Sequence, residues 1–197
     1  GKPDVVHAHF TDLAYIAVKA LYDQHLPIIM TEHSSAVNQA HISESLMNTA
    51  NYAYSNVNEI VAVSPSLQNT ILEKFNYHSK YIPNMVNLEI FGFDEAFKAE
   101  SHYKIVSVGN LIPLKAMDIL IKQFAKFKAT VADSSLEIFG DGQERKNLEL
   151  LIKSLNIEDS VKLNGLCPRQ IIAATLKRSD AFVLASRSET FGVAYIE

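Results

Sequence analysis

The fold is indicated most clearly by one stretch in the second half of the chain, Lys104-Ile105-Val106-Ser107-Val108-Gly109-Asn110. Its apolar and β-branched residues predict a buried strand over residues 104–108 that stops at Gly109. An apolar stripe of helical spacing follows at residues 117–127, and a second apolar run follows that stripe at residues 136–139. This order is typical of a βαβ unit, in which a helix joins two parallel strands.

The same alternation extends through the whole chain and predicts an α/β protein whose parallel sheets are covered by helices on both faces. Further candidate strands lie at residues 5–8, 27–30, 59–63, 80–82, 161–163 and 181–185. Further helical stripes lie at residues 148–155 and at Leu13, Ile16, Ala17, Ala20 and Leu21. Eight candidate strands are more than one small sheet usually holds. The alternation of strands and helical stripes breaks between Pro83 and His102, where the expected crossover helix is missing. We therefore place a domain boundary in that interval.

The composition excludes several classes of protein. Lys and Arg number 18 against 22 Asp and Glu, a net charge of −4, so there is no basic surface for nucleic acid. The single cysteine, Cys167, excludes an intrachain disulfide and agrees with a reducing compartment such as a cytoplasm. No apolar run approaches the roughly 18 to 20 residues that span a bilayer. The opening residues run straight into an apolar stretch and Glu197 falls inside a helical pattern, so we expect both ends to be cuts.

Two strand-to-helix turns in the second half carry candidate ligand residues, because ligands of doubly wound sheets bind beyond the carboxyl ends of the strands. Lys115 stands shortly before a helix, where an ammonium beside free helix N–H groups can neutralise a diphosphate. A solvated lysine near a helix start is the alternative interpretation. Gly140 and Gly142 follow the strand at 136–139 and permit the close backbone approach that a phosphate loop requires, or they form a plain tight turn.

A third turn follows the last candidate strand and reads Ser186-Arg187-Ser188-Glu189-Thr190-Phe191-Gly192. We expect a helix to begin at Phe191 and to reach Glu197, with the N–H groups of residues 190–192 directed at an anion. Glu197, about two turns along that helix, could accept two hydrogen bonds from a ribose diol. The alternative is an acidic residue that stabilises the helix dipole, with Glu197 merely exposed.

The first half carries a fourth candidate site, built from histidines. His7 and His9 alternate onto one face of their strand, and Thr31-Glu32-His33-Ser34 follows the next strand. Two strand histidines without an assured third ligand are more often structural than zinc-binding, so we expect no metal. His33, just past a strand end, suits hydrogen bonding to a sugar or an acceptor, with a capping histidine as the alternative.

These four turns, in this order, resemble the retaining glycosyltransferases of family 4, which have the GT-B architecture of two Rossmann-like domains. The similarity covers nearly the whole chain and includes Asp4-Val5-Val6-His7-Ala8-His9, Thr31-Glu32-His33, Val61-Ala62-Val63-Ser64 and the exit segment Ile82-Pro83-Asn84-Met85-Val86-Asn87. Residues 1–90 resemble the C-terminal part of the acceptor-side domain, with an exit linker to about residue 102. Residues 103–197 resemble the N-terminal part of the donor domain and end on the second glutamate of the E-x(7)-E motif, so both domains would be incomplete.

The resemblance implies that a sugar passes from a nucleotide diphosphate sugar, of UDP or GDP type, to an acceptor hydroxyl with retention of configuration. It implies no cofactor and no required metal. The reacting centre would contain His33, Lys115 and Glu189. The donor would be bound by Asn110, Lys115, Gly140, Gly142, Cys167, Thr190, Phe191, Gly192 and Glu197. A saccharide or lipid-linked saccharide would be the acceptor, in bacterial-type surface glycan assembly.

The same resemblance implies a cytoplasmic protein, peripheral at the inner face of the membrane through parts outside this chain. Three positions depart from the family pattern. Asn110 stands where many members have an arginine on the diphosphate, so one positive charge is missing. Ala116 replaces the usual glycine after the lysine, which we expect to be tolerated if φ stays negative. Asn84-Met85 replaces the common Asn-Gly of the hinge.

Three other functions remain alternatives. A nucleotide-sugar epimerase of the same fold would eliminate the nucleotide without an acceptor, and a non-catalytic sugar-nucleotide binding module would bind the donor without turnover. A nicotinamide-dependent dehydrogenase is disfavoured, because no strand is followed by a complete G-x-G-x-x-G turn and Arg145 stands where the third glycine would be. We expect this stretch alone to be inactive, since a helix of residues 191–197 is too short to persist without support.

Overall fold

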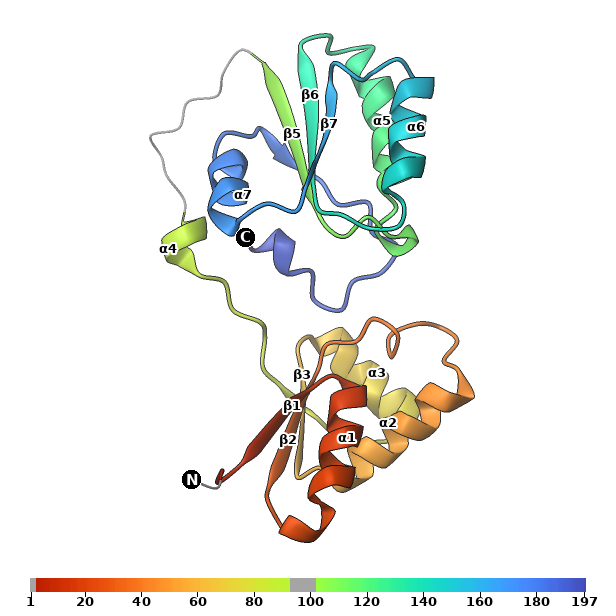
Figure 1. Cartoon of the computed structure of the whole chain (residues 1–197), viewed down its shortest axis with the longest axis vertical. Coiled ribbons are helices and arrows are strands. Elements are labelled where there is room, and N and C mark those ends of the chain that lie inside the picture. Colours follow the sequence, from red (N-terminus) through yellow and green to blue (C-terminus); the bar gives the residue numbers. More distant parts are fainter. Residues whose placement is uncertain (1–2, 93–101) are drawn as a thin grey trace. The chain divides into compact units, whose positions relative to one another are not determined.

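The computed structural model describes residues 3–92 and 102–197, which form two compact units (Figure 1). The first unit contains the residues up to Met85 together with Glu189–Gly192, and the second contains residues 86–188 and 193–197. The part of the expected linker at residues 93–101 lies outside the described residues. In the described part of that interval, a one-turn helix, α4 (Leu88–Phe91), stands where no helix was predicted.

The first unit is built on a parallel sheet of four strands in the order β1-β2-β3-β4. The strands are β1 (Val6–His9), β2 (Ile28–Glu32), β3 (Glu59–Ala62) and β4 (Lys80–Tyr81). They are connected by α1 (Thr11–Leu21) with a short 3₁₀ turn (Tyr22–Gln24), by α2 (Glu44–Asn56) and by α3 (Pro65–Phe75). All four strands were predicted from their short apolar runs, and their bounds differ from the prediction by a few residues.

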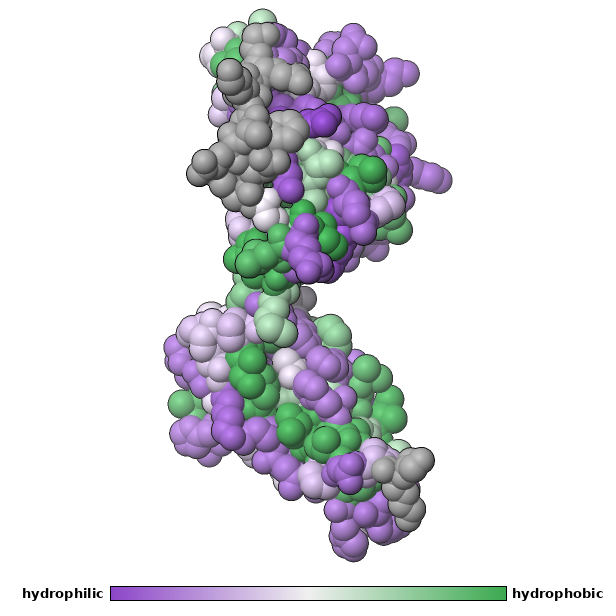
Figure 2. All heavy atoms as spheres, turned by 90° about the vertical axis from the view of Figure 1, so that its left-hand side faces the viewer, coloured by the Kyte–Doolittle hydropathy of each residue, from purple (hydrophilic) through white to green (hydrophobic). Residues whose placement is uncertain are grey.

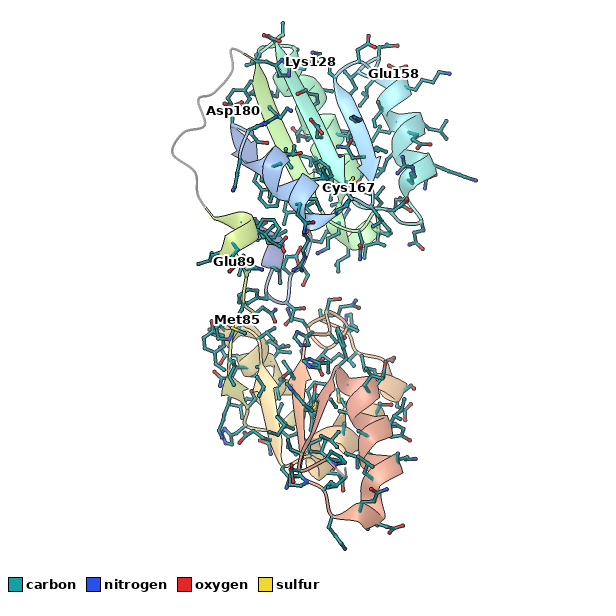
Figure 3. All side chains as sticks on the ribbon, turned by 60° about the vertical axis from the view of Figure 1, so that its left-hand side comes forward. Met85, Glu89, Lys128, Glu158, Cys167 and Asp180 are labelled. Carbon is teal, nitrogen blue, oxygen red and sulfur yellow. The ribbon has the colours of Figure 1, made fainter. Side chains whose placement is uncertain are left out.

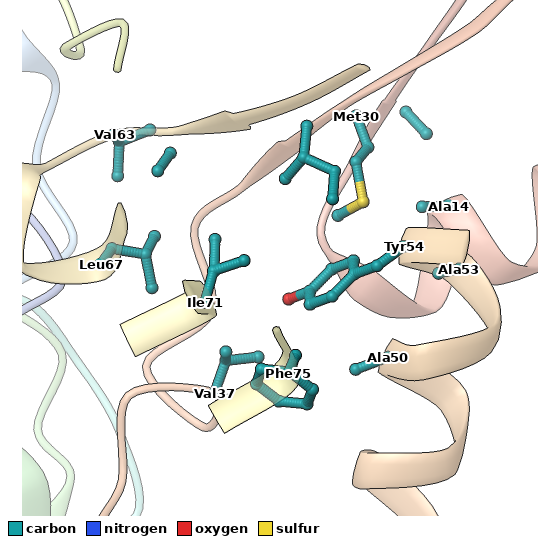
Figure 4. Close-up of a cluster of buried hydrophobic side chains, with 13 residues drawn as sticks. Ala14, Met30, Val37, Ala50, Ala53, Tyr54, Val63, Leu67, Ile71 and Phe75 are labelled. Atoms are coloured by element: carbon teal, nitrogen blue, oxygen red, sulfur yellow. The ribbon is translucent and has the colours of Figure 1, made fainter. Parts of the chain in front are cut away.

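One hydrophobic cluster holds this unit together (Figure 4). Ala14 of α1, Tyr54 of α2 and Ile71 of α3 all contribute to it, together with Met30 of the sheet. The three helices therefore pack on the same face, whereas helices on both faces were predicted. The reason is topological: successive right-handed crossovers that move in one direction along a sheet place their helices on one side. Figure 2 views this unit from the side of its strands, and hydrophobic side chains are visible there.

The buried face of α1 is made of small side chains and differs from the predicted stripe. Ala14 and Val18 are buried, whereas Leu13 and Ile16 are 54% and 58% exposed. Ala14 belongs to the same cluster as Ala50 and Ala53 of α2, so the two helices meet through methyl groups. The predicted stripe is therefore wrong at Leu13 and Ile16, although the helix is present and Ala17 of the stripe packs against the cluster.

The second unit contains another parallel sheet of four strands, in the order β7-β6-β5-β8. The strands are β5 (Tyr103–Val108), β6 (Ser134–Phe139), β7 (Val161–Gly165) and β8 (Ala181–Phe182). The connections are a 3₁₀ turn (Pro113–Lys115), α5 (Met117–Lys128), α6 (Arg145–Ser154) and α7 (Arg169–Leu176), and a second 3₁₀ turn (Val193–Tyr195) follows β8. Both sheets are parallel, so the predicted α/β class is confirmed.

The strand order of the second unit reverses direction once. The chain moves outward from β5 to β6 to β7 and then returns to the opposite side of β5 as β8. Right-handed crossovers then place α5 and α6 on one face and α7 on the other, as Figure 1 shows. Leu120, Leu136 and Leu148 belong to the cluster between the sheet and the pair α5 and α6. A reversal of this kind opens a crevice beyond the carboxyl ends of the two strands that flank it, here β5 and β8.

The predicted helix from Phe191 to Glu197 is wrong. Gly192 has a φ of 76°, a left-handed conformation that an α-helix cannot contain. Only Val193–Tyr195 form a single 3₁₀ turn, and the Glu197 N–H donates to the Val193 carbonyl at 3.2 Å. Glu197 therefore lies one turn, and not two, beyond the start of helical structure.

Candidate functional site

The carboxyl edge of the second sheet is tied together by backbone hydrogen bonds between its loops. Gly109 N–H donates to the Phe139 carbonyl at 2.9 Å, which joins the ends of β5 and β6. Gly140 N–H donates to the Gly165 carbonyl at 2.8 Å, which joins the ends of β6 and β7. Arg187 N–H donates to the Leu114 carbonyl at 2.9 Å and brings the loop after β8 to the loop after β5. The four loops thus form one connected edge.

Lys115 stands on this edge at the reversal between β5 and β8. It ends the 3₁₀ turn and lies two residues before Met117, the first residue of α5. Its aliphatic stem crosses Gly109: a Cβ added there would meet the Lys115 Cδ at 3.7 Å. A glycine at the end of β5 therefore makes room for the stem, two residues before α5 begins.

The charges around the start of α5 are partly paired. Asp118, in its first turn, lies 3.0 Å from the Lys122 ammonium, and this hydrogen bond lowers the pKa of the Asp118 carboxyl, with a smaller contribution from Arg187. Asp118 therefore stays ionised, and part of its charge is balanced by Lys122. Lys115 and Arg187 are the basic residues of the two joined loops, while Asn110 is exposed on the same edge.

Ala116 separates Lys115 from α5, and its backbone differs from the prediction. Its φ is 49°, in the left-handed region, so the negative φ on which its tolerance was expected to depend is absent. The side chain is 1% exposed, so the strained residue is held by packing on every side. Positive φ at a non-glycine residue costs about 1–2 kcal/mol, which explains why glycine suits this turn.

Gly140 and Gly142 are required by packing between the loops themselves. A Cβ on Gly140, whose φ is 132°, would lie 2.0 Å from the Gly109 carbonyl oxygen. A Cβ on Gly142 would lie 2.5 Å from the Leu111 carbonyl oxygen. Glu144 N–H donates to that same carbonyl at 3.0 Å. The close approach that these glycines permit is thus made to the neighbouring loop, and a role in ligand binding remains a prediction.

Cys167 follows β7 on the same edge, just before α7 (Figure 3). Its thiol donates a long contact of 3.7 Å to the Asn164 carbonyl, and the side chain is half-buried. Nearby, Arg145 at the start of α6 donates to the Leu163 carbonyl within β7 at 3.2 Å and lies 3.6 Å from Asp141 of the loop after β6. The guanidinium therefore stiffens the edge next to Cys167.

The E-x(7)-E segment is divided between the two units. Glu189, Thr190, Phe191 and Gly192 belong to the first unit, where Phe191 packs against the hydrophobic cluster. Glu197 belongs to the second unit, is half-buried, and lies 3.6 Å from the Arg169 guanidinium at the start of α7. Before the segment, Ser186 has a buried hydroxyl without a hydrogen-bond partner among the described residues.

The first unit has its own cluster of polar residues at the ends of β1 and β2. His9 Nδ1 lies 3.0 Å from His33 Nε2, and the two rings are stacked with centroids 5.2 Å apart. His7 is on the same face, with its ring 4.4 Å from that of His9 and its Nε2 2.8 Å from the Thr31 hydroxyl. Burial lowers the pKa of His33, and the neighbouring His9 and His7 lower it further, so His33 is neutral near pH 7.

Glu32, next to His33, is fully buried and was not singled out by the sequence. Its carboxylate accepts from Tyr54 of α2 and from Thr11 of α1, as well as from two backbone N–H groups. An acidic residue at the end of an apolar strand is the signal that could have found it. Among the described residues, no group of three or more His, Cys, Asp or Glu is arranged to hold a metal ion.

The structure therefore distributes the predicted site residues over the two units. Asn110, Lys115, Gly140, Gly142 and Cys167 lie on loops of one sheet edge in the second unit. His33 and Glu189–Gly192 belong to the first unit. Within residues 3–92 and 102–197, no helix is both long and apolar enough to cross a bilayer.

Comparisons with known proteins follow the same division. The family profile described as "Glycosyl transferases group 1" matches residues 92–197, and the profile "Glycosyltransferase Family 4" matches residues 1–90. The chain is 27% identical to N-acetyl-alpha-D-glucosaminyl L-malate synthase of Bacillus anthracis over 98% of its own length and 53% of that protein. The chain thus spans about half the length of this curated relative.

Solved structures show the same fold. Sucrose-phosphate synthase from Thermosynechococcus elongatus superposes with a TM-score of 0.83 at 18% identity, over 98% of this chain and 53% of that one. Anabaena HepE in complex with UDP and glucose superposes with a TM-score of 0.80 at 18% identity, over 97% of this chain and 55% of that one. The two parallel sheets with their helices are those of the GT-B fold.

Proposed function

The chain belongs to the group 1 glycosyl transferases, and we propose that the whole protein transfers a sugar from a nucleotide diphosphate sugar to an acceptor hydroxyl with retention of configuration. The observation that carries the proposal is the reversal of strand order between β5 and β8, with Lys115 on one flanking loop and Arg187 on the other. Open α/β sheets bind their ligands at such a reversal.

The donor diphosphate is assigned to this edge of the sheet because the edge carries cationic side chains and helix N–H groups, which suit an anion. The Lys115 ammonium and the first N–H groups of α5 would face the negative charge that develops on the diphosphate as the sugar departs. With Asn110 in place of an arginine, Lys115 and Arg187 carry this charge together. Stabilisation of this kind acts in the transition state and therefore raises kcat.

The other donor contacts follow the family pattern. Glu197 binds the ribose diol, the loops of Gly140, Gly142 and Cys167 surround the nucleotide, and the N–H groups of Thr190, Phe191 and Gly192 meet the sugar and phosphate. Glu189 and His33 contact the donor sugar. The UDP bound to HepE supports a UDP-type donor, with GDP as the other candidate. No side chain of this set is placed as a covalent nucleophile, so the acceptor attacks from the face that the diphosphate leaves.

A biological setting is proposed for the whole protein as well. The single cysteine supports a reducing compartment, so we place the protein in the cytoplasm. A saccharide or lipid-linked saccharide acceptor and a role in surface glycan assembly follow the habits of the family. Peripheral contact with the inner face of the membrane would involve parts outside this chain.

Retention is tested by the anomer that the whole protein releases when water replaces the acceptor. UDP-glucose, UDP-N-acetylglucosamine and GDP-mannose are each incubated with the protein, and the anomeric proton of the freed sugar is followed by NMR. From the donor that is used, the α-sugar is expected first, before mutarotation. A β-sugar would contradict retention, an altered sugar would favour the epimerase, and bound donor without turnover would favour a binding module.

A further inference from the structure

We propose that Glu32 and His9 are positioning residues, which hold the His33 ring in one orientation and one tautomer so that its Nδ1 accepts a hydrogen bond from a donor-sugar hydroxyl. The inference rests on the proposed function, since that function places His33 beside the sugar. Neither Glu32 nor His9 would contact the sugar, and both would act through His33.

Glu32 fixes the backbone on which His33 stands. One carboxylate oxygen accepts from the His33 N–H at 3.0 Å and from the Ser34 N–H at 2.8 Å. The other accepts from the Tyr54 hydroxyl at 2.8 Å and from the Thr11 hydroxyl. Four donors, from the loop after β2 and from α1 and α2, therefore meet on one buried carboxylate and fill its lone pairs. A buried charge is tolerated only when it is satisfied in this way.

The donors to Glu32 remain donors across the ordinary pH range. Burial raises the pKa of the Tyr54 hydroxyl, and the nearby Glu32 charge raises it further. Tyr54 is 3% exposed and belongs to the hydrophobic cluster of the first unit. The turn that carries His33 is thus anchored to the core and not only to its own loop.

His9 fixes the ring of His33. With 3.0 Å between His9 Nδ1 and His33 Nε2, one of these nitrogens donates and the other accepts. The lowered pKa of His33 supports a neutral ring, which carries one N–H. If each ring adopts the commoner Nε2–H tautomer, the His33 Nε2–H donates to the His9 Nδ1. The His33 Nδ1 then keeps its lone pair, and a sugar hydroxyl is the donor that it selects.

The tautomer is measured directly by ¹⁵N NMR of the histidine rings in the whole protein at pH 7, with His33 assigned from a His33→Gln variant. The wild type is expected to show a bare Nδ1 and a protonated Nε2. His9→Phe keeps a stacked ring but removes the partner nitrogen, so His33 is expected to shift toward a mixture of tautomers. An unchanged His33 spectrum in His9→Phe would overturn the role of His9, whatever the activity of the protein.

Kinetics separate positioning from a general loss of structure. His9→Phe and Glu32→Gln are each expected to lower kcat by about tenfold with little change in the donor KM, because a misplaced group costs rate. In a His33→Gln background, both substitutions are expected to have no further effect, since they act only through His33. The control is His78→Phe, an exposed histidine of the same unit.

Two results would overturn the proposal in the kinetic experiment. One is an equal loss of kcat from His9→Phe or Glu32→Gln in the His33→Gln background. The other is a loss of activity in His9→Phe that follows a lowered melting temperature. The absence of any transferase activity in the wild-type protein would instead contradict the proposed function. The NMR measurement would then still show whether the His33 ring is held in one tautomer.

Discussion

Replacing Lys115 with methionine is expected to lower kcat for sugar transfer by about 10²–10³-fold, the usual cost of removing one preorganised charge or donor from a transition state. Methionine keeps an unbranched stem of similar length over Gly109, so the loop between β5 and α5 should survive. What is lost is the ammonium at the reversal of the sheet. The measurement is kcat of the whole protein at saturating donor, with the melting temperature recorded for each variant.

Lys122→Met is the matched control for this experiment. Lys122 lies on α5, the helix that follows Lys115, and pairs with Asp118 at 3.0 Å, and its side chain is 52% exposed. Its loss should change kcat by less than about threefold, because exposed ion pairs contribute little. A Lys115→Met protein that keeps its rate within the same range would remove Lys115 from the reacting centre.

Replacing Gly140 with alanine is expected to lower the free energy of unfolding of the second unit by at least about 3 kcal/mol, the combined cost of overpacking and a disallowed backbone. The new Cβ would lie 2.0 Å from the Gly109 carbonyl oxygen, and the φ of 132° is one that alanine rarely adopts. The atoms that the new Cβ would meet belong to the backbone of Gly109 and Asn110, which cannot move aside as the end of a side chain can. Urea unfolding followed by circular dichroism gives the change.

Gly109→Ala provides the comparison on the opposite loop. Its new Cβ would meet the end of the Met117 side chain at 3.3 Å, and a methionine can move aside. The expected loss is about 1 kcal/mol or less. Equal stabilities of the two variants would contradict the view that Gly140 is fixed by the contact between loops.

Most strands of the two sheets could be predicted because they are short apolar runs, and parallel strands buried in a sheet need no alternation. The exception is β4, in which Lys80 and Tyr81 are both exposed. The helices were less visible. The buried residues of α2 include Ala50 and Ala53, which produce no apolar stripe, and α2 was not predicted. The start of α2 was nevertheless marked in the sequence, since the Ser43 side chain accepts from the Leu46 N–H as an N-cap. In the same way Ser64, just before Pro65, accepts from the Leu67 N–H at the start of α3.

The candidate site was predictable only where it follows strand ends. Lys115, Gly140 and Cys167 lie on one edge because the carboxyl ends of parallel strands meet there. The anchor of His33 was not predictable, since Thr11 and Tyr54 lie 21 and 22 residues from Glu32 along the chain. The left-handed Ala116 was also missed, because a buried methyl gives no sequence signal for a strained backbone.

The most direct test of the central claim is calorimetric titration of UDP, GDP, ADP and NAD into the whole protein, its Lys115→Met variant and its Glu197→Ala variant. One nucleoside diphosphate is expected to bind, and each substitution is expected to weaken it by about tenfold or more, since hydrogen bonds to charged groups contribute about 1.5–3 kcal/mol. That result would place the donor at the edge of β5 and β8 and would identify the base. Binding of NAD without any nucleoside diphosphate, or equal diphosphate affinity in all three proteins, would contradict it.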